Sequence, residues 1–122
     1  MKRTVLFAAL ALLAVTAAAT ISRAELKISG DGANMKVDVS GYPANFQAIY
    51  PNFIKKCAKC HGIDRTFVTL QTGVTPSGTP FDNAAIDAYG AKMLRKPDSD
   101  MSKQEVKQFV DLMKYMAEEA VK

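Results

Sequence analysis

Histidine and cysteine are the scarcest reactive residues in this chain, whose 122 residues include one histidine and two cysteines. All three lie within residues 57–61, so the sequence contains no second histidine and no thiol elsewhere. No cluster of acids or nucleophiles surrounds this segment, and such a cluster is what hydrolysis or acid–base catalysis requires. These absences make an autonomous enzyme the least favoured class of protein.

The first 24 residues have the composition of a targeting segment. Lys2 and Arg3 precede an acid-free run rich in alanine and leucine, which is followed by Ser22, Arg23 and Ala24. This order is typical of a secretory signal peptide, and we predict cleavage after Ala24. An uncleaved membrane anchor is the alternative, but the run is slightly short for the roughly 20 residues that a span needs.

Without residues 1–24, the chain has no large excess of positive or negative charge. That segment holds three basic residues and no acid, so the sixteen basic residues of the chain become thirteen against twelve acids. The net charge therefore falls from +4 to +1, which gives no support to nucleic-acid binding. We predict a protein of the periplasm or another extracytoplasmic space, with no stable membrane span after cleavage.

Residues 57–61 have the sequence CAKCH, which is the C-x-x-C-H pattern of c-type haem attachment. The thiols of Cys57 and Cys60 would add to the two porphyrin vinyl groups, and the imidazole of His61 would bind the iron. A disulfide between the two cysteines would close a very small loop and would leave His61 unexplained. A zinc site is disfavoured because adjacent Cys60 and His61 cannot easily reach one tetrahedral ion, and a fourth ligand is missing.

The chain after the leader is predicted to form an N-terminal arm and one helical domain. Residues 25–43 alternate apolar and polar side chains around a Gly-rich turn at 30–34, which favours a short β-hairpin. The predicted organisation is a signal peptide at 1–24, this arm or hairpin at 25–43, and a mainly α domain at 44–122.

Apolar residues at helical spacing predict three helices in that domain, over residues 44–59, about 80–94 and 103–121. The last helix carries a long apolar stripe, and we expect the helix before the CAKCH motif to cover it. Gly90 either weakens the middle helix or lets another element approach closely. Residues 62–80 lose the periodicity, and we predict a loop there that wraps a prosthetic group.

Capping residues predict where two of these helices begin. Thr79 followed by Pro80 suits an N-cap and the first helical position of the middle helix. Ser102 with Glu105 three residues later is a capping box, so the last helix should begin directly after Ser102.

Together these features resemble a small class I cytochrome c over residues 44–121. The resemblance rests on Phe53 four residues before the first motif cysteine, the CAKCH motif followed by a glycine, a middle helix and a capped last helix. It implies a cytochrome c-like fold around one covalently attached haem c, held by Cys57 and Cys60, with His61 as the proximal iron ligand. In that family the first and last helices cross, and a methionine before the last helix is usually the distal ligand.

The resemblance leaves two methionines as candidates for the distal ligand. Met93 lies nine residues before Ser102, and the family's ligand methionine lies several residues before the last helix, which favours Met93. Met101 directly precedes Ser102, where packing on Val106 as a hydrophobic staple already explains it. The alternatives for Met93 are a core position in the middle helix, and for the iron a lysine ligand or an open position.

We therefore predict an exported mono-haem c-type cytochrome that carries electrons between redox partner proteins by cycling its iron between ferric and ferrous states. Lys55, Lys56 and Lys59 beside the motif could steer an acidic partner, or could simply be a solvated helix face. One alternative is a haem-based module that binds or senses a small ligand at an open iron. Another is a haem subunit of a partner oxidoreductase, with the N-terminal arm as its docking element.

Overall fold

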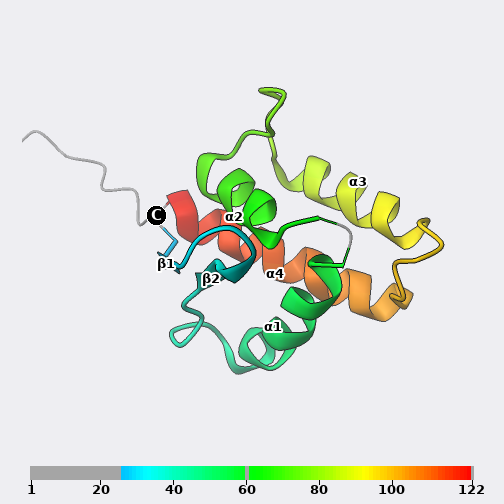
Figure 1. Cartoon of the computed structure of the whole chain (residues 1–122), viewed down its shortest axis with the longest axis horizontal. Helices are drawn as coiled ribbons and strands as arrows, with labels where there is room; N and C mark the ends of the chain where they lie inside the picture. The colour runs from blue at the N-terminus through cyan, green and yellow to red at the C-terminus, as the bar shows by residue number, and fades with distance from the viewer. Residues whose placement is uncertain (1–25, 60, 122) are drawn as a thin grey trace, which may run out of the picture.

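Four helices and a two-stranded antiparallel sheet make up the described part of the chain, which is mainly helical (Figure 1). A computed structural model describes residues 26–59 and 61–121, so the predicted signal peptide and Cys60 lie outside the described residues. The elements follow the order β1 (Ile28–Ser29), a 3-10 turn η1 (Gly32–Asn34), β2 (Lys36–Val37), α1 (Ala44–Cys57), α2 (Ile63–Thr72), α3 (Asn83–Leu94) and α4 (Lys103–Val121).

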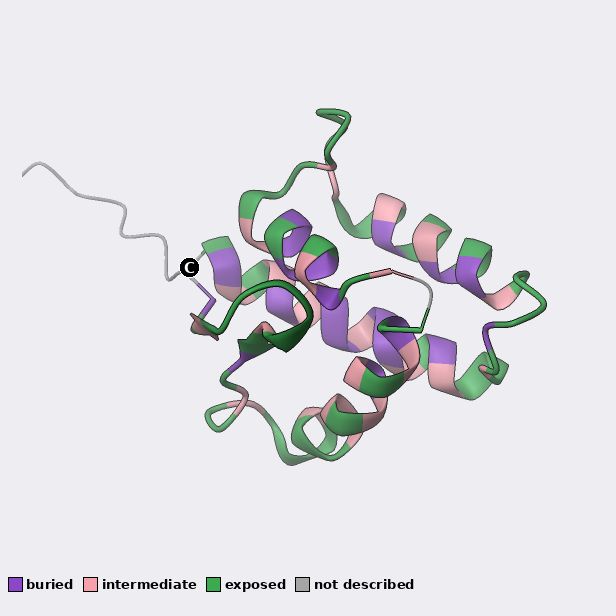
Figure 2. Ribbon diagram, viewed as in Figure 1, coloured by how far each residue is buried: buried purple, intermediate pink, exposed green. Residues whose placement is uncertain are grey.

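Helix α4 is the element against which α1, α2 and α3 all pack (Figure 1). Figure 2 shows buried residues on the faces that α2, α3 and α4 turn inward. Phe53 of α1 is fully buried, and its ring centroid lies 5.6 Å from Phe109 of α4 and 6.4 Å from Phe67 of α2. The predicted contact of α1 with the last helix is confirmed, but α2 and α3 also pack against that helix. The reason is that the buried face of α4 is wider than one helix can cover; it comprises Val106, Phe109, Val110, Leu112, Met113, Met116 and Ala120.

Helices α3 and α4 cross at Gly90, which is buried. A Cβ atom added there would clash with Cγ2 of Val110 and would lie 3.3 Å from Cγ1 of Val106. Of the two roles predicted for Gly90, the close approach is therefore confirmed, because only a residue without a side chain leaves room for these valines.

We expect Gly90→Ala to lower the free energy of unfolding by about 1 kcal/mol, measured by chemical denaturation. Alanine improves helix propensity by about 1 kcal/mol, whereas overpacking a buried contact costs about 1–3 kcal/mol, so the clash should prevail. Gly41→Ala is the matched control, because a Cβ atom there meets nothing within 4 Å. A Gly90→Ala protein more stable than the parent would contradict the close crossing.

The predicted N-terminal hairpin is confirmed, with Ile28 paired to Val37 in an antiparallel register. A two-stranded ribbon is marginal on its own, and here two side chains of the helical domain hold it. The backbone N–H of Val37 donates to the hydroxyl of Tyr50 at 2.8 Å, and the N–H of Leu26 donates to Oε1 of Gln71 at 2.7 Å. The arm therefore fastens onto α1 and α2.

The loop predicted over residues 62–80 is wrong in its first half, because Ile63–Thr72 forms α2. Its apolar positions Ile63, Phe67 and Leu70 follow helical spacing, and all three are buried. Intervening β-branched residues, which have low helix propensity, obscured that spacing. Gly73, in the left-handed conformation with φ 72°, ends the helix, and the loop is confined to the residues between α2 and α3.

The predicted start of the middle helix is also wrong, since α3 begins after Asp82. The Asp82 carboxylate accepts the backbone N–H of Ala85 at 2.9 Å, and aspartate caps helices better than threonine. Pro80 instead forms an isolated antiparallel bridge with Val74 that closes the preceding loop.

The capping box at α4 is confirmed, with the backbone N–H of Glu105 donating to Oγ of Ser102 at 3.1 Å and the N–H of Ser102 donating to Oε2 of Glu105 at 2.8 Å. We expect Ser102→Ala to lower the free energy of unfolding, measured by chemical denaturation, by about 1 kcal/mol, because the backbone N–H of Glu105 loses its acceptor. Ser102→Thr keeps the accepting oxygen and serves as the control. Unchanged stability would refute the cap.

Candidate functional site

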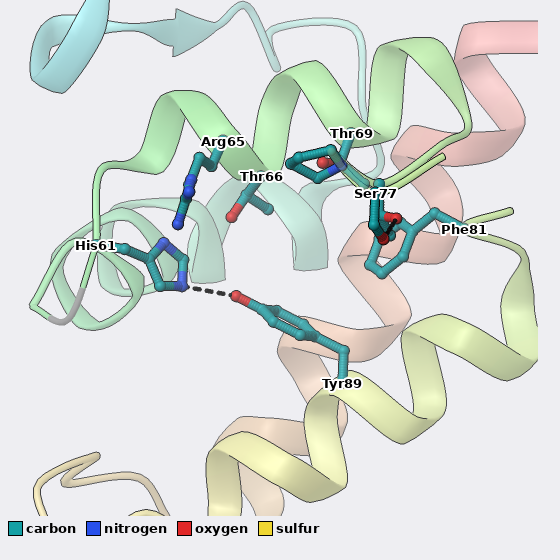
Figure 3. Close-up of a pocket in the computed structure, with 9 residues that line it drawn as sticks. His61, Arg65, Thr66, Thr69, Ser77, Phe81 and Tyr89 are labelled. Carbon is teal, nitrogen blue, oxygen red and sulfur yellow. Dashed lines mark hydrogen bonds between the residues drawn. The ribbon is translucent and has the colours of Figure 1, made fainter. Parts of the chain in front are cut away.

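The CAKCH motif lies where α1 ends and the turn to α2 begins, opposite α3 (Figure 1). Cys57 is the last residue of α1 and only 4% exposed, so the helix fixes the direction of its thiol. His61 follows two residues before α2, and its ring extends toward α3 (Figure 3). Cys60 lies outside the described residues.

Two hydrogen bonds indicate which nitrogen of His61 carries the proton when the ring is neutral. Nδ1 lies 3.2 Å from the carbonyl oxygen of Gly62, which can only accept, so Nδ1 donates to it. Nε2 lies 2.8 Å from the hydroxyl of Tyr89, and in this tautomer it accepts the hydroxyl proton (Figure 3). A backbone carbonyl at the other ring nitrogen is the usual arrangement of a metal-binding histidine. In the neutral ring, Nε2 is therefore the nitrogen that carries the lone pair.

Two cavities of about 370 and 290 Å³ share His61, Arg65 and Tyr89 in their lining. The larger, which we call the threonine cavity, is lined further by Thr66, Thr69, Thr75, Pro76, Ser77 and Phe81 (Figure 3). The smaller, which we call the methionine cavity, is lined further by Lys56, Cys57, Lys92, Met93, Lys96, Ser99 and Met101. The three shared side chains line both cavities.

The methionine cavity collects the predicted site residues that the structure describes. Its lining includes Cys57, His61 and both candidate methionines. Met93 comes from α3, and Met101 comes from the loop before α4. Met93 is 8% exposed yet lies outside the core cluster of the described residues, whereas Met101 packs against that cluster. Met93 is one of the buried residues of α3, which agrees with the predicted core position, and the choice of ligand stays a prediction.

Four cations line the methionine cavity, and among its described lining residues there is no acid. Such a lining attracts a ligand with carboxylates, because charge-assisted hydrogen bonds to lysine and arginine are the strong ones. The donor set therefore fits haem: a thiol for a thioether bond, an imidazole in the right tautomer, thioether sulfurs, and cations for the two porphyrin carboxylates. The cations are Lys56, Arg65, Lys92 and Lys96.

An ion-pair network ties the end of α1 to the loop before α4. The ammonium group of Lys59 lies 3.2 Å from the Asp100 carboxylate, and that of Lys56 lies 3.5 Å from the carboxylates of both Asp100 and Glu105. The hydrogen bond from Lys59 and the charge of Lys56 hold the pKa of Asp100 below its usual value. Asp100 has φ 52°, so this network stabilises a left-handed turn directly before Met101.

The same ion-pair network bears on the prediction that Lys55, Lys56 and Lys59 steer an acidic partner. Lys56 and Lys59 are engaged with acids, and of the three lysines only Lys55 has no ion pair within the described part of the chain. Paired charges produce a weaker field than isolated ones, and the cavity lysines Lys92 and Lys96 form no ion pair within the described residues.

Tyr89 is the site residue that the sequence alone did not single out. Its hydrophobic ring places it on the apolar side of the middle helix, and nothing local indicates that its hydroxyl reaches His61, 28 residues away. The one available signal is the spacing of four residues to Met93, which puts both side chains on one helix face.

Comparisons with known proteins add no evidence about this site. No family model, curated protein or solved structure matches this chain. Within residues 26–59 and 61–121, no three His, Cys, Asp or Glu side chains gather into a metal site, and no helix is long and apolar enough to cross a membrane.

Proposed function

We propose that this protein is an exported mono-haem c-type cytochrome that carries electrons and is not itself an enzyme. The observation that carries the proposal is the meeting of Cys57, His61 and two methionines at one cavity. Haem c bound there would supply one-electron chemistry through its iron.

Each residue of the site has a role toward that cofactor. Cys57 and Cys60 would hold the porphyrin covalently, which prevents its loss outside the cell. His61 would bind the iron through Nε2, supported by its Nδ1–H bond to the carbonyl of Gly62. Met93 would be the distal ligand, and its soft thioether would favour ferrous iron and raise the reduction potential.

The cationic lining supports a haem rather than an uncharged ligand. Arg65, Lys92 and Lys96 have no acid partner within the described residues, so their charges are available to the porphyrin carboxylates or to an acidic redox partner. The N-terminal hairpin is engaged with α1 and α2, which makes it less suited to the docking role considered for an oxidoreductase subunit.

A haem-based module that binds a small ligand is the second candidate, and the threonine cavity favours it. That cavity offers about 370 Å³ beside His61, with hydroxyl groups from Thr66, Thr69 and Ser77 among its lining. A polar ligand at an open iron could find hydrogen bonds there. An iron with both axial positions filled, one of them by methionine, would instead indicate electron transfer.

An absorption spectrum of the protein matured with a haem-attachment system tests the proposal. We expect a reduced c-type haem spectrum that survives denaturation and extraction with acidic solvent, because the thioether bonds are covalent. A mature N-terminus at Glu25, measured by mass spectrometry on the same sample, would establish cleavage of the leader. Haem that is extracted completely, or protein that never acquires haem, would refute the function.

A further inference from the structure

We propose that the loop between α3 and α4, residues 95–102, is a lid on the methionine cavity and that Lys56 is the latch that holds it. Lys96, Ser99 and Met101 of this loop line the cavity. Lys56 lines it from α1. The inference goes beyond the proposed function, because it concerns contacts of the chain with itself.

The ammonium group of Lys56 joins three elements at one point. The side chain is only 15% exposed, and its ammonium group donates to the backbone carbonyl of Asp100 and lies 3.5 Å from the carboxylates of both Asp100 and Glu105. Asn52, one turn earlier on α1, donates to Oε1 of Glu105 at 3.1 Å. Lys56 therefore connects α1, the loop and the first turn of α4. Partly buried pairs are screened less by salt than exposed ones, so this connection persists at ordinary ionic strength.

The left-handed turn at Asp100 depends on this contact. A φ of 52° is uncommon for a residue with a side chain and persists where the surroundings hold it. The carbonyl of Asp100 is the acceptor for Lys56, so the hydrogen bond fixes the peptide group that leads into Met101. Release of Lys56 removes the support of the turn and with it the position of Met101 at the cavity.

The loop also has the features of a segment that opens locally. Residues 95–98 and Asp100 are exposed, and the backbone N–H of Ser99 donates within the loop, to the carbonyl of Lys96 at 3.2 Å. Exposed backbone with local hydrogen bonds opens more readily than a buried helix. On the inner side Ser99 is buried and Met101 packs against the core cluster, so the closed position is well defined. The loop can therefore leave the cavity while α4 stays folded.

Hydrogen–deuterium exchange of the protein as isolated, measured by mass spectrometry, tests the latch. Lys56→Met keeps an unbranched apolar side chain and removes the charge. We expect peptides over residues 98–102 to exchange about tenfold faster than in the parent, the factor that charge-assisted hydrogen bonds allow. Peptides over residues 106–116 of α4 should exchange at the parental rate. Lys55→Met is the matched control, because it makes the same charge change at a lysine with no ion pair within the described residues.

Asp100→Asn tests the other half of the contact and keeps the test decisive if Lys56→Met does not fold. Asparagine tolerates the left-handed conformation as aspartate does, so this variant removes the charge and leaves the turn. It should also speed exchange over residues 98–102. Because both variants act on one contact, the double variant should exchange within about twofold of Lys56→Met alone.

Parental exchange of the loop in both single variants would overturn the latch. Equal acceleration of the loop and of α4 would overturn the lid, because the whole domain would then be opening. Neither measurement requires haem, so a protein that acquires no haem would refute the proposed function alone, and the exchange rates would still decide this inference.

Discussion

Replacement of both motif cysteines, Cys57→Ala with Cys60→Ala, should abolish covalent haem. In the proposed cytochrome each thioether would anchor the porphyrin independently of the iron bond, and the sequence has no other cysteine that could take over. Cys57 is buried and lines the methionine cavity with His61, so its thiol would attach the porphyrin inside the proposed site. Pyridine haemochrome content per protein, measured after acidic solvent extraction, should fall to background.

Ala58, one of the two exposed residues between the cysteines, provides the control for this experiment. Ala58→Ser leaves both thiols and His61 in place, so its haem content should equal that of the parent. Each single cysteine variant should give a sharply reduced yield, because one thioether still holds the porphyrin but the attachment is incomplete. Parental covalent haem in the double variant would end the proposal of a c-type cytochrome.

Met93→Leu should remove the ferric methionine-to-iron charge-transfer band and lower the reduction potential. Leucine keeps the volume and apolarity of methionine, so a purely packing role predicts a cost under about 1.5 kcal/mol and no change at the iron. A ligand role predicts the opposite pattern, because the sulfur that stabilises ferrous iron is lost. The absorbance band and a redox titration of the holoprotein therefore separate the two roles.

Met101→Leu is the matched control, since Met101 lines the same cavity but packs against the core cluster. It should keep the band and lose a little stability. A band that survives in Met93→Leu and disappears in Met101→Leu would make Met101 the ligand. A parent protein that never shows the band would move the ligand-binding module ahead of electron transfer.

Signals that act within a few residues predicted much of this structure. The capping box of Ser102 and Glu105, the apolar period of the last helix and the alternation of the hairpin each depend on one turn or one strand pair. The same locality explains the two errors. The β-branched residues of α2 obscured its period, and Asp82 competed with Thr79 for the cap of α3.

The sequence by itself determined the chemical content of the site: one histidine, two cysteines at haem-attachment spacing, and candidate methionines near the last helix. Tertiary structure alone decided which of these groups meet. Met93 and Met101 reach the cavity of His61 because α3 crosses α4 closely at Gly90 and because an ion-pair network holds the loop before α4. The hydroxyl of Tyr89 reaches Nε2 across 28 residues of chain for the same reason. Such contacts depend on helix packing over the whole domain, and no periodicity within a single helix encodes them.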